Sequence, residues 1–177
     1  MEENGLIRKC RDIVAEVLQP LDYWGYRPYV IGEPMGKWIS EHADLECMDY
    51  HQLEGISPSR IDLPDRGYIL ISLMSSEKVV VLEKVNPDCI IECIDVDIDF
   101  GLRNKLQSAS EWLSQFISVL EEKGYKISRR EGNTIFFEGN NQFIRLKIRS
   151  NCYVEIRMTT LEYIDNFDAY NTYEQFP

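Results

Sequence analysis

The residues of this sequence best suited to chemistry are three aspartates at alternate positions, Asp95, Asp97 and Asp99. Apolar residues separate them, so the run predicts a β-strand with the three carboxylates about 6.6–7 Å apart on one face. Carboxylates in such an arrangement can hold Mg²⁺ or transfer protons. An EF-hand calcium loop is excluded because its sixth and twelfth positions are Phe100 and Leu106, where glycine and an acid are required.

Three other interpretations find little support. A nucleotidyltransferase-like Mg²⁺ site needs a Gly-Ser turn shortly before the aspartates, and residues 80–87 contain none. His42, Cys47 and His51 offer three zinc-ligand types within ten residues, but not at the paired spacing of tetrahedral sites and with no evident fourth ligand. Cys47 and His51 as a nucleophilic pair lack a third, orienting group. We expect no cofactor, and metal binding by these three residues stays open.

A basic ladder mirrors the acidic one. Arg145, Lys147 and Arg149 alternate with apolar residues, so they are also predicted to share one face of a strand. Three interpretations remain open: the two ladders pair across a sheet, each is an ordinary solvated surface, or one of them binds a partner. Aromatic residues such as Tyr125, Phe136 and Tyr153 lie among the arginines and lysines of this part of the chain. This pattern also fits RNA binding by a sheet, which the net charge of the chain disfavours.

The net charge of −11 on 177 residues is unevenly distributed. Residues 40–65 hold seven acids and one base, residues 86–100 five acids, and residues 158–177 four acids, whereas residues 123–149 hold seven bases and two acids. This acidity disfavours binding to nucleic acid or to an anionic membrane, because like charges repel, and it favours a basic partner. The simpler alternative is acidity for solubility alone.

The composition also indicates where the protein works. Five scattered cysteines favour reduced thiols and a cytoplasmic location. The N-terminal residues lack the pattern of a secretory leader, and no apolar run approaches the roughly 20 residues of a membrane span. Phosphate-binding glycine loops, dinucleotide-binding fingerprints, nucleophile elbows and zincin motifs are absent from the sequence.

Hydrophobic periodicity predicts amphipathic helices over residues 5–19 and 108–123, the second beginning at a Ser108–Glu111 capping box and ending at Gly124. Residues 32–67 are rich in proline and glycine, and they predict an ordered loop region with one short helix near 41–53. A last short helix is predicted near 161–169. Strands separated by turn residues are predicted over residues 29–31, 68–74, 79–85, 89–100, 125–130, 134–138, 142–149 and 152–158.

Together these elements predict one α+β domain over residues 1–177, an antiparallel sheet of about six or seven strands with the two main helices packed on one face. The halves 1–100 and 101–177 resemble each other, since each runs from a helix through Gly-Tyr and a basic residue into strands. The resemblance fits either a degenerate duplication or the ordinary chemistry of a helix-to-strand junction.

No motif in the sequence indicates a particular reaction. We expect a non-catalytic intracellular protein that presents acidic surfaces to a basic protein partner, as immunity proteins and inhibitors do. The alternatives are a chaperone or adaptor for a secreted or extended client protein, and a metal-dependent enzyme that uses the aspartate ladder. The identity of the partner and the oligomeric state stay open. The acids expected to contact the partner are Asp95, Asp97, Asp99, Glu41, Asp44, Glu46 and Asp49, and the basic face consists of Arg145, Lys147 and Arg149.

Overall fold

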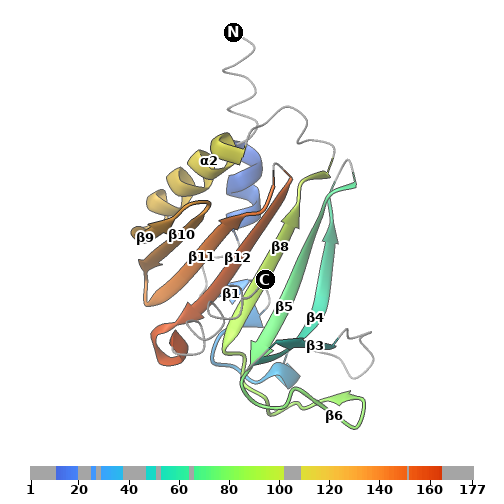
Figure 1. Cartoon of the computed structure of the whole chain (residues 1–177). Helices are drawn as coiled ribbons and strands as arrows, with labels where there is room; N and C mark the ends of the chain where they lie inside the picture. Colours follow the sequence, from blue (N-terminus) through green and yellow to red (C-terminus); the bar gives the residue numbers. More distant parts are fainter. Residues whose placement is uncertain are drawn as a thin grey trace.

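The protein has an α+β fold built on an eight-stranded antiparallel sheet of order β3-β4-β5-β8-β12-β11-β10-β9. A helical segment at residues 11–19 and α2 (Ala109–Glu122) lie on one face of it (Figure 1). This confirms the predicted fold class. The sheet has eight strands, where six or seven were expected. The computed structural model describes residues 11–19, 25–26, 29–37, 47–50, 53–63, 66–101, 109–150 and 152–164.

The remaining elements are strands and short 3₁₀ turns. The strands of the main sheet are β3 (Cys47–Tyr50), β4 (Leu53–Asp62), β5 (Tyr68–Ser75), β8 (Cys93–Asp99), β9 (Lys126–Glu131), β10 (Thr134–Gly139), β11 (Gln142–Ile148) and β12 (Tyr153–Thr160). Two small sheets pair β1 (Gly25–Tyr26) with β2 (Tyr29–Val30), and β6 (Val80–Val81) with β7 (Lys84–Val85). The 3₁₀ turns are η2 (Met35–Lys37) and η5 (Leu161–Tyr163).

The two halves of the chain contribute four strands each to the sheet. Strands β3, β4, β5 and β8 run in chain order from one edge to the middle, and β9, β10, β11 and β12 do the same from the other edge. The last strand of each half therefore meets the other in the antiparallel pair β8–β12. This arrangement places the aspartate run of β8 at the centre of the sheet.

Alternate strand residues and both helices bury their apolar side chains in one shared core. In β8 the inward residues Ile94, Val96 and Ile98 are fully buried. The rings of Phe100 and Trp112 stack with their centroids 4.1 Å apart, which joins the end of β8 to α2. The opposite face of the sheet, which we call the outer face, carries the intervening polar residues.

Two predicted chain reversals are confirmed. Gly124 ends α2 with φ +95°, and its N–H donates to the Glu121 carbonyl while that of Tyr125 donates to the Leu120 carbonyl, as in a Schellman motif. Asn140 and Asn141, both with positive φ, form the two-residue turn between β10 and β11. The predicted start of α2 at Ser108 lies outside the described residues.

The loop predicted over residues 32–67 was wrong in its second half, and so was the short helix near 41–53, since β3 and β4 occupy residues 47–50 and 53–62. The residues that suggested a loop hold special positions in a strand. Pro58, which has no N–H to donate, lies where the register between β4 and β5 shifts. Gly55 lies so close to Met74 that an added Cβ would come within 2.3 Å of its sulfur.

The run 79–85, predicted as one strand of a meander, stays outside the main sheet. Strand β5 pairs directly with β8, and β6 and β7 form a separate hairpin that projects from one end of the sheet (Figure 1). Its turn residues Leu82 and Glu83 have φ of 53° and 62°. Left-handed backbone is uncommon for these residue types, so the sequence carried no turn signal at this point.

The Phe100–Trp112 stack predicts a large effect of mutation on stability. Trp112→Ala should lower the free energy of unfolding by about 3–5 kcal/mol, because it opens a cavity between α2 and the sheet. Denaturant unfolding followed by circular dichroism measures the change. Leu161→Ala, at an exposed position, is the control and should change it by about 0.5 kcal/mol or less. A loss below about 1 kcal/mol for Trp112→Ala would contradict the packing described.

Candidate functional site

Both predicted ladders lie on the outer face of the sheet, with one strand between them. Asp95, Asp97 and Asp99 alternate with the core residues of β8, while Arg145 and Lys147 belong to β11. Strand β12 separates β8 from β11. The ladders therefore do not pair with each other directly, and the residues of β12 determine how the charges are matched.

The centre of the outer face is a buried ion pair between β8 and β12. Arg157 donates from Nε to Asp95 Oδ1 at 2.6 Å and from Nη2 to Asp95 Oδ2 at 3.0 Å. The two side chains are 6% and 11% exposed, and the two-pronged geometry gives strong charge-assisted hydrogen bonds. Arg145 stands opposite Arg157 on β11 and is also buried. Asp95 is thus bound within the protein, by an arginine that sequence patterns did not single out as a site residue.

Of the three aspartates, Asp97 is the one whose partner on β12 is an acid. It stands directly opposite Glu155 in the β8–β12 pairing. Burial, followed by the charges of Asp95 and Glu155, raises the pKa of Asp97 to about 7, although Arg157 and a hydrogen bond from the Tyr153 hydroxyl oppose the rise. At neutral pH this carboxyl is therefore about half protonated, and a cation beside it would favour the charged form.

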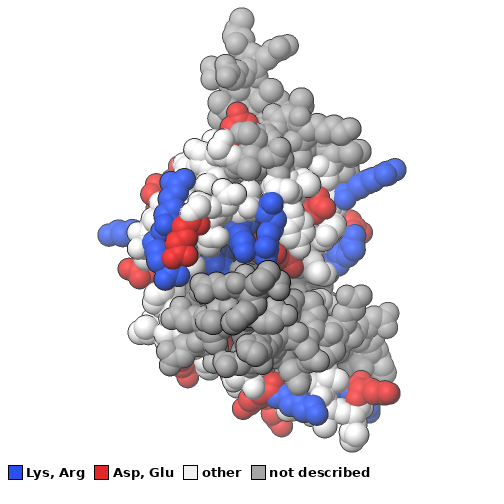
Figure 2. Space-filling model, in the orientation of Figure 1, with Lys and Arg blue, Asp and Glu red and all other residues white. Residues whose placement is uncertain are grey.

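The other ladder residues make local contacts. Asp99 Oδ1 accepts a hydrogen bond from the Gly101 N–H at 2.7 Å. Arg149 Nε lies 3.0 Å from Glu155 Oε2. Lys147 on β11 is the residue directly opposite Glu155 in the β11–β12 pairing. Figure 2 shows the result on one face of the molecule, where Lys and Arg gather over β9–β11 with Asp and Glu among them. The outer face is a network of both signs rather than a uniformly acidic surface.

The remaining predicted site residues are in the N-terminal half. Glu41, His42, Asp44, Glu46 and His51 lie outside the described residues, and Cys47 and Asp49 belong to β3, which ends the described sheet on one side. Whether His42, Cys47 and His51 bind a metal therefore stays open. Among the residues that the structure does describe, no three His, Cys, Asp or Glu side chains come together as a metal site would require.

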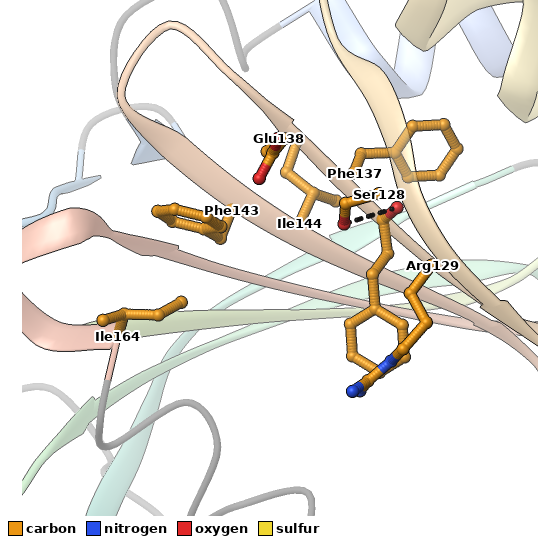
Figure 3. Close-up of a pocket in the computed structure, with 8 residues that line it drawn as sticks. Ser128, Arg129, Phe137, Glu138, Phe143, Ile144 and Ile164 are labelled. Atoms are coloured by element: carbon orange, nitrogen blue, oxygen red, sulfur yellow. Dashed lines mark hydrogen bonds between the residues drawn. The ribbon is translucent and has the colours of Figure 1, made fainter.

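A hollow of about 200 Å³ lies beside β9, β10 and β11 (Figure 3). Phe136, Phe143 and Ile164 supply apolar lining. The Arg129 guanidinium lies 4.0 Å from the centroid of the Phe136 ring, and Glu138 stands on another side of the hollow (Figure 3). The sequence contained one signal for it, since two phenylalanines occupy outer-face strand positions where the alternation predicts polar residues.

Comparison with known proteins adds no family to these observations. The chain matches no known protein family, no curated protein and no solved structure. In the part of the chain that the structure describes, no helix is long and apolar enough to cross a membrane.

The Asp95–Arg157 pair predicts strong destabilisation when one partner is removed. Arg157→Met or Asp95→Asn should each cost about 3–5 kcal/mol in denaturant unfolding, because the remaining charge or polar group is left buried without its partner. The double variant Asp95→Leu/Arg157→Met should recover much of that loss. Arg60→Met, at an exposed ion pair with Asp62, is the control and should cost about 1 kcal/mol or less. Equal effects at the two pairs would contradict the account.

Asp97 predicts an inverse dependence of stability on pH. The folded protein releases this proton near pH 7, whereas the ordinary value for aspartate is 3.8, so between these values the folded state holds more protons and loses stability as the pH rises. Asp97→Asn should remove this loss and be more stable than the natural protein by about 4 kcal/mol at pH 8, with the two converging toward pH 4. Thermal or denaturant unfolding across this range measures it. Parallel pH profiles for the two proteins would contradict the raised pKa.

Proposed function

We propose that the protein is a non-catalytic binding protein that takes up a basic segment of a partner protein on the outer face of its sheet, at Asp97, Glu155 and Asp99. The observation that carries this proposal is the direct opposition of Asp97 and Glu155 on the two central strands. Two carboxylates facing each other across a strand pair repel. A lysine or arginine of the partner placed between them would relieve that repulsion.

The neighbouring contacts support Asp97 as the anchor for such a cation. Asp95 is taken by Arg157, and Glu155 is shared with Arg149. Asp97 is only partly buried, so a partner side chain can approach it. Partial burial also strengthens an interaction with an incoming charge, because solvent and salt screen it less than at the open surface.

More specifically, we propose that the protein is an inhibitor that binds one defined partner, as immunity proteins do. Side chains fixed by strand packing lose little freedom on binding, which favours affinity for one defined partner. The net charge of −11 would attract a basic partner over a distance and raise the rate of encounter. We place this activity in the cytoplasm, where Cys89, Cys93 and Cys152, which form no disulfide, remain reduced.

A second candidate, a chaperone or adaptor for an extended client, is favoured by the hollow at β9–β11. Strand β9 ends the described sheet on its other side, where an extended peptide can add as a further strand while an apolar side chain enters the hollow. Salt separates the two candidates, since binding at Asp97 should weaken as salt screens the charges. A client held mainly by apolar and main-chain contacts should remain bound.

A ten-residue lysine peptide tests the proposed site by isothermal titration calorimetry. Asp97→Asn should weaken binding about fivefold at pH 8, because the anchoring charge is lost. The natural protein should also bind several-fold more tightly at pH 8 than at pH 6, because Asp97 ionises over this range.

Glu121→Gln is the matched control, since it removes one exposed negative charge from α2, on the opposite face of the sheet. It should leave the affinity for the lysine peptide within about twofold of the natural value. Equal weakening by Asp97→Asn and Glu121→Gln, or an affinity that does not change between pH 6 and pH 8, would argue against the site.

A further inference from the structure

The β6–β7 hairpin carries an unusually exposed apolar residue at its tip. Leu82 is 91% exposed and Val81 beside it 44%, and Figure 1 shows the hairpin projecting from the sheet. The base of the hairpin is well held, since Val79 is buried and its carbonyl accepts a hydrogen bond from the Asn86 N–H at 2.7 Å. Leu82 and Val81 therefore expose an apolar surface at the tip of the hairpin.

The backbone of the tip is also unusual. Leu82 and Glu83 both have left-handed backbone, with φ of 53° and 62°. Two-residue turns of this shape usually contain Asn and Gly, which adopt it at lower cost. The turn therefore carries a leucine and a glutamate at the expense of backbone strain, and strain of this kind is concentrated at functional positions.

The hollow at β9–β11 matches this tip in size and chemistry. An apolar cavity of about 150 Å³ in another protein is large enough for benzene, so the hollow of about 200 Å³ has room for a leucine side chain. Its lining by Phe136, Phe143 and Ile164 offers the apolar contacts that Leu82 lacks in its own chain.

The charges around the two surfaces are also complementary. Glu83 and Lys84 follow Leu82 in the turn, while Arg129 and Glu138 stand beside the hollow (Figure 3). Arg129 Nε already lies 3.1 Å from Glu131 Oε1 at an exposed position. With Leu82 inside the hollow, Glu83 would join this pair beside Arg129, and Lys84 would meet Glu138.

From size, apolarity and charge together, we propose that the protein associates with itself head to tail, with Leu82 of one copy inserted into the hollow of a second copy. The hairpin and β9–β10 lie at opposite ends of the molecule in Figure 1, so the tip does not reach the hollow of its own chain. Each copy keeps one free tip and one free hollow, so the contact extends into rings or chains rather than closing as a dimer. The contact is far smaller than the roughly 1,200 Å² of stable interfaces, and the association is therefore weak.

Sedimentation velocity from about 10 to about 500 µM tests this proposal. The natural protein should form species beyond a dimer as the concentration rises. Leu82→Asp removes the tip and Phe143→Asp removes the hollow, so each variant alone should stay monomeric. Their equimolar mixture should form a 1:1 dimer and nothing larger, because one variant keeps the hollow and the other keeps the tip. Ile61→Asp, at another exposed apolar position, is the control and should associate like the natural protein.

A charge exchange covers the case in which Phe143→Asp does not fold. Glu83→Arg and Arg129→Glu should each weaken association about tenfold, and the double variant should restore it. A natural protein that stays monomeric throughout, Leu82→Asp that associates normally, or a charge exchange without restoration overturns the proposal. Binding of the lysine peptide by Leu82→Asp should be unchanged, so self-association and the proposed function can fail separately.

Discussion

The buried pair of Asp95 and Arg157 is the interaction on which the arrangement of the outer face depends. It joins β8, the last strand of the first half of the chain, to β12, the last strand of the second half. Two charges are stable away from water only in good hydrogen-bonding geometry, and here that geometry requires one register between the two strands. The same register brings Glu155 opposite Asp97, two residues along each strand. The register that pairs Asp95 with Arg157 therefore places Asp97 opposite a like charge.

This coupling explains how a protein with a strongly acidic composition can have a specific site. Most charges of the outer face are matched locally, as Arg149 and Glu155 are, and Asp99 accepts a backbone hydrogen bond. Burial, and after it the charges of Asp95 and Glu155, raise the pKa of Asp97. A cation of a basic partner stabilises a carboxylate most where the protein's own cations stabilise it least. We therefore place the binding site at Asp97 and do not attribute binding to the acidity of the chain as a whole.

Local patterns predicted the features that local physics controls. Alternation placed Asp95, Asp97 and Asp99 on one face of a strand, and glycine and asparagine marked the end of α2 and the β10–β11 turn. Strand neighbours are set by contacts distant in sequence, so the position of β12 between the ladders and the role of Arg157 were not predictable from spacing. Strand β4 was missed because Pro58 lies at a register shift, where a strand tolerates it.

We propose that Asp97 takes up a cation of the partner and gives up its proton as it does so. Calorimetry of lysine-peptide binding at pH 7, in buffers that differ in ionisation enthalpy, counts the protons released on binding. Because the pKa of Asp97 is about 7, the account predicts release of about half a proton by the natural protein and essentially none by Asp97→Asn. Binding without proton release by the natural protein, or the same release by both proteins, would contradict it.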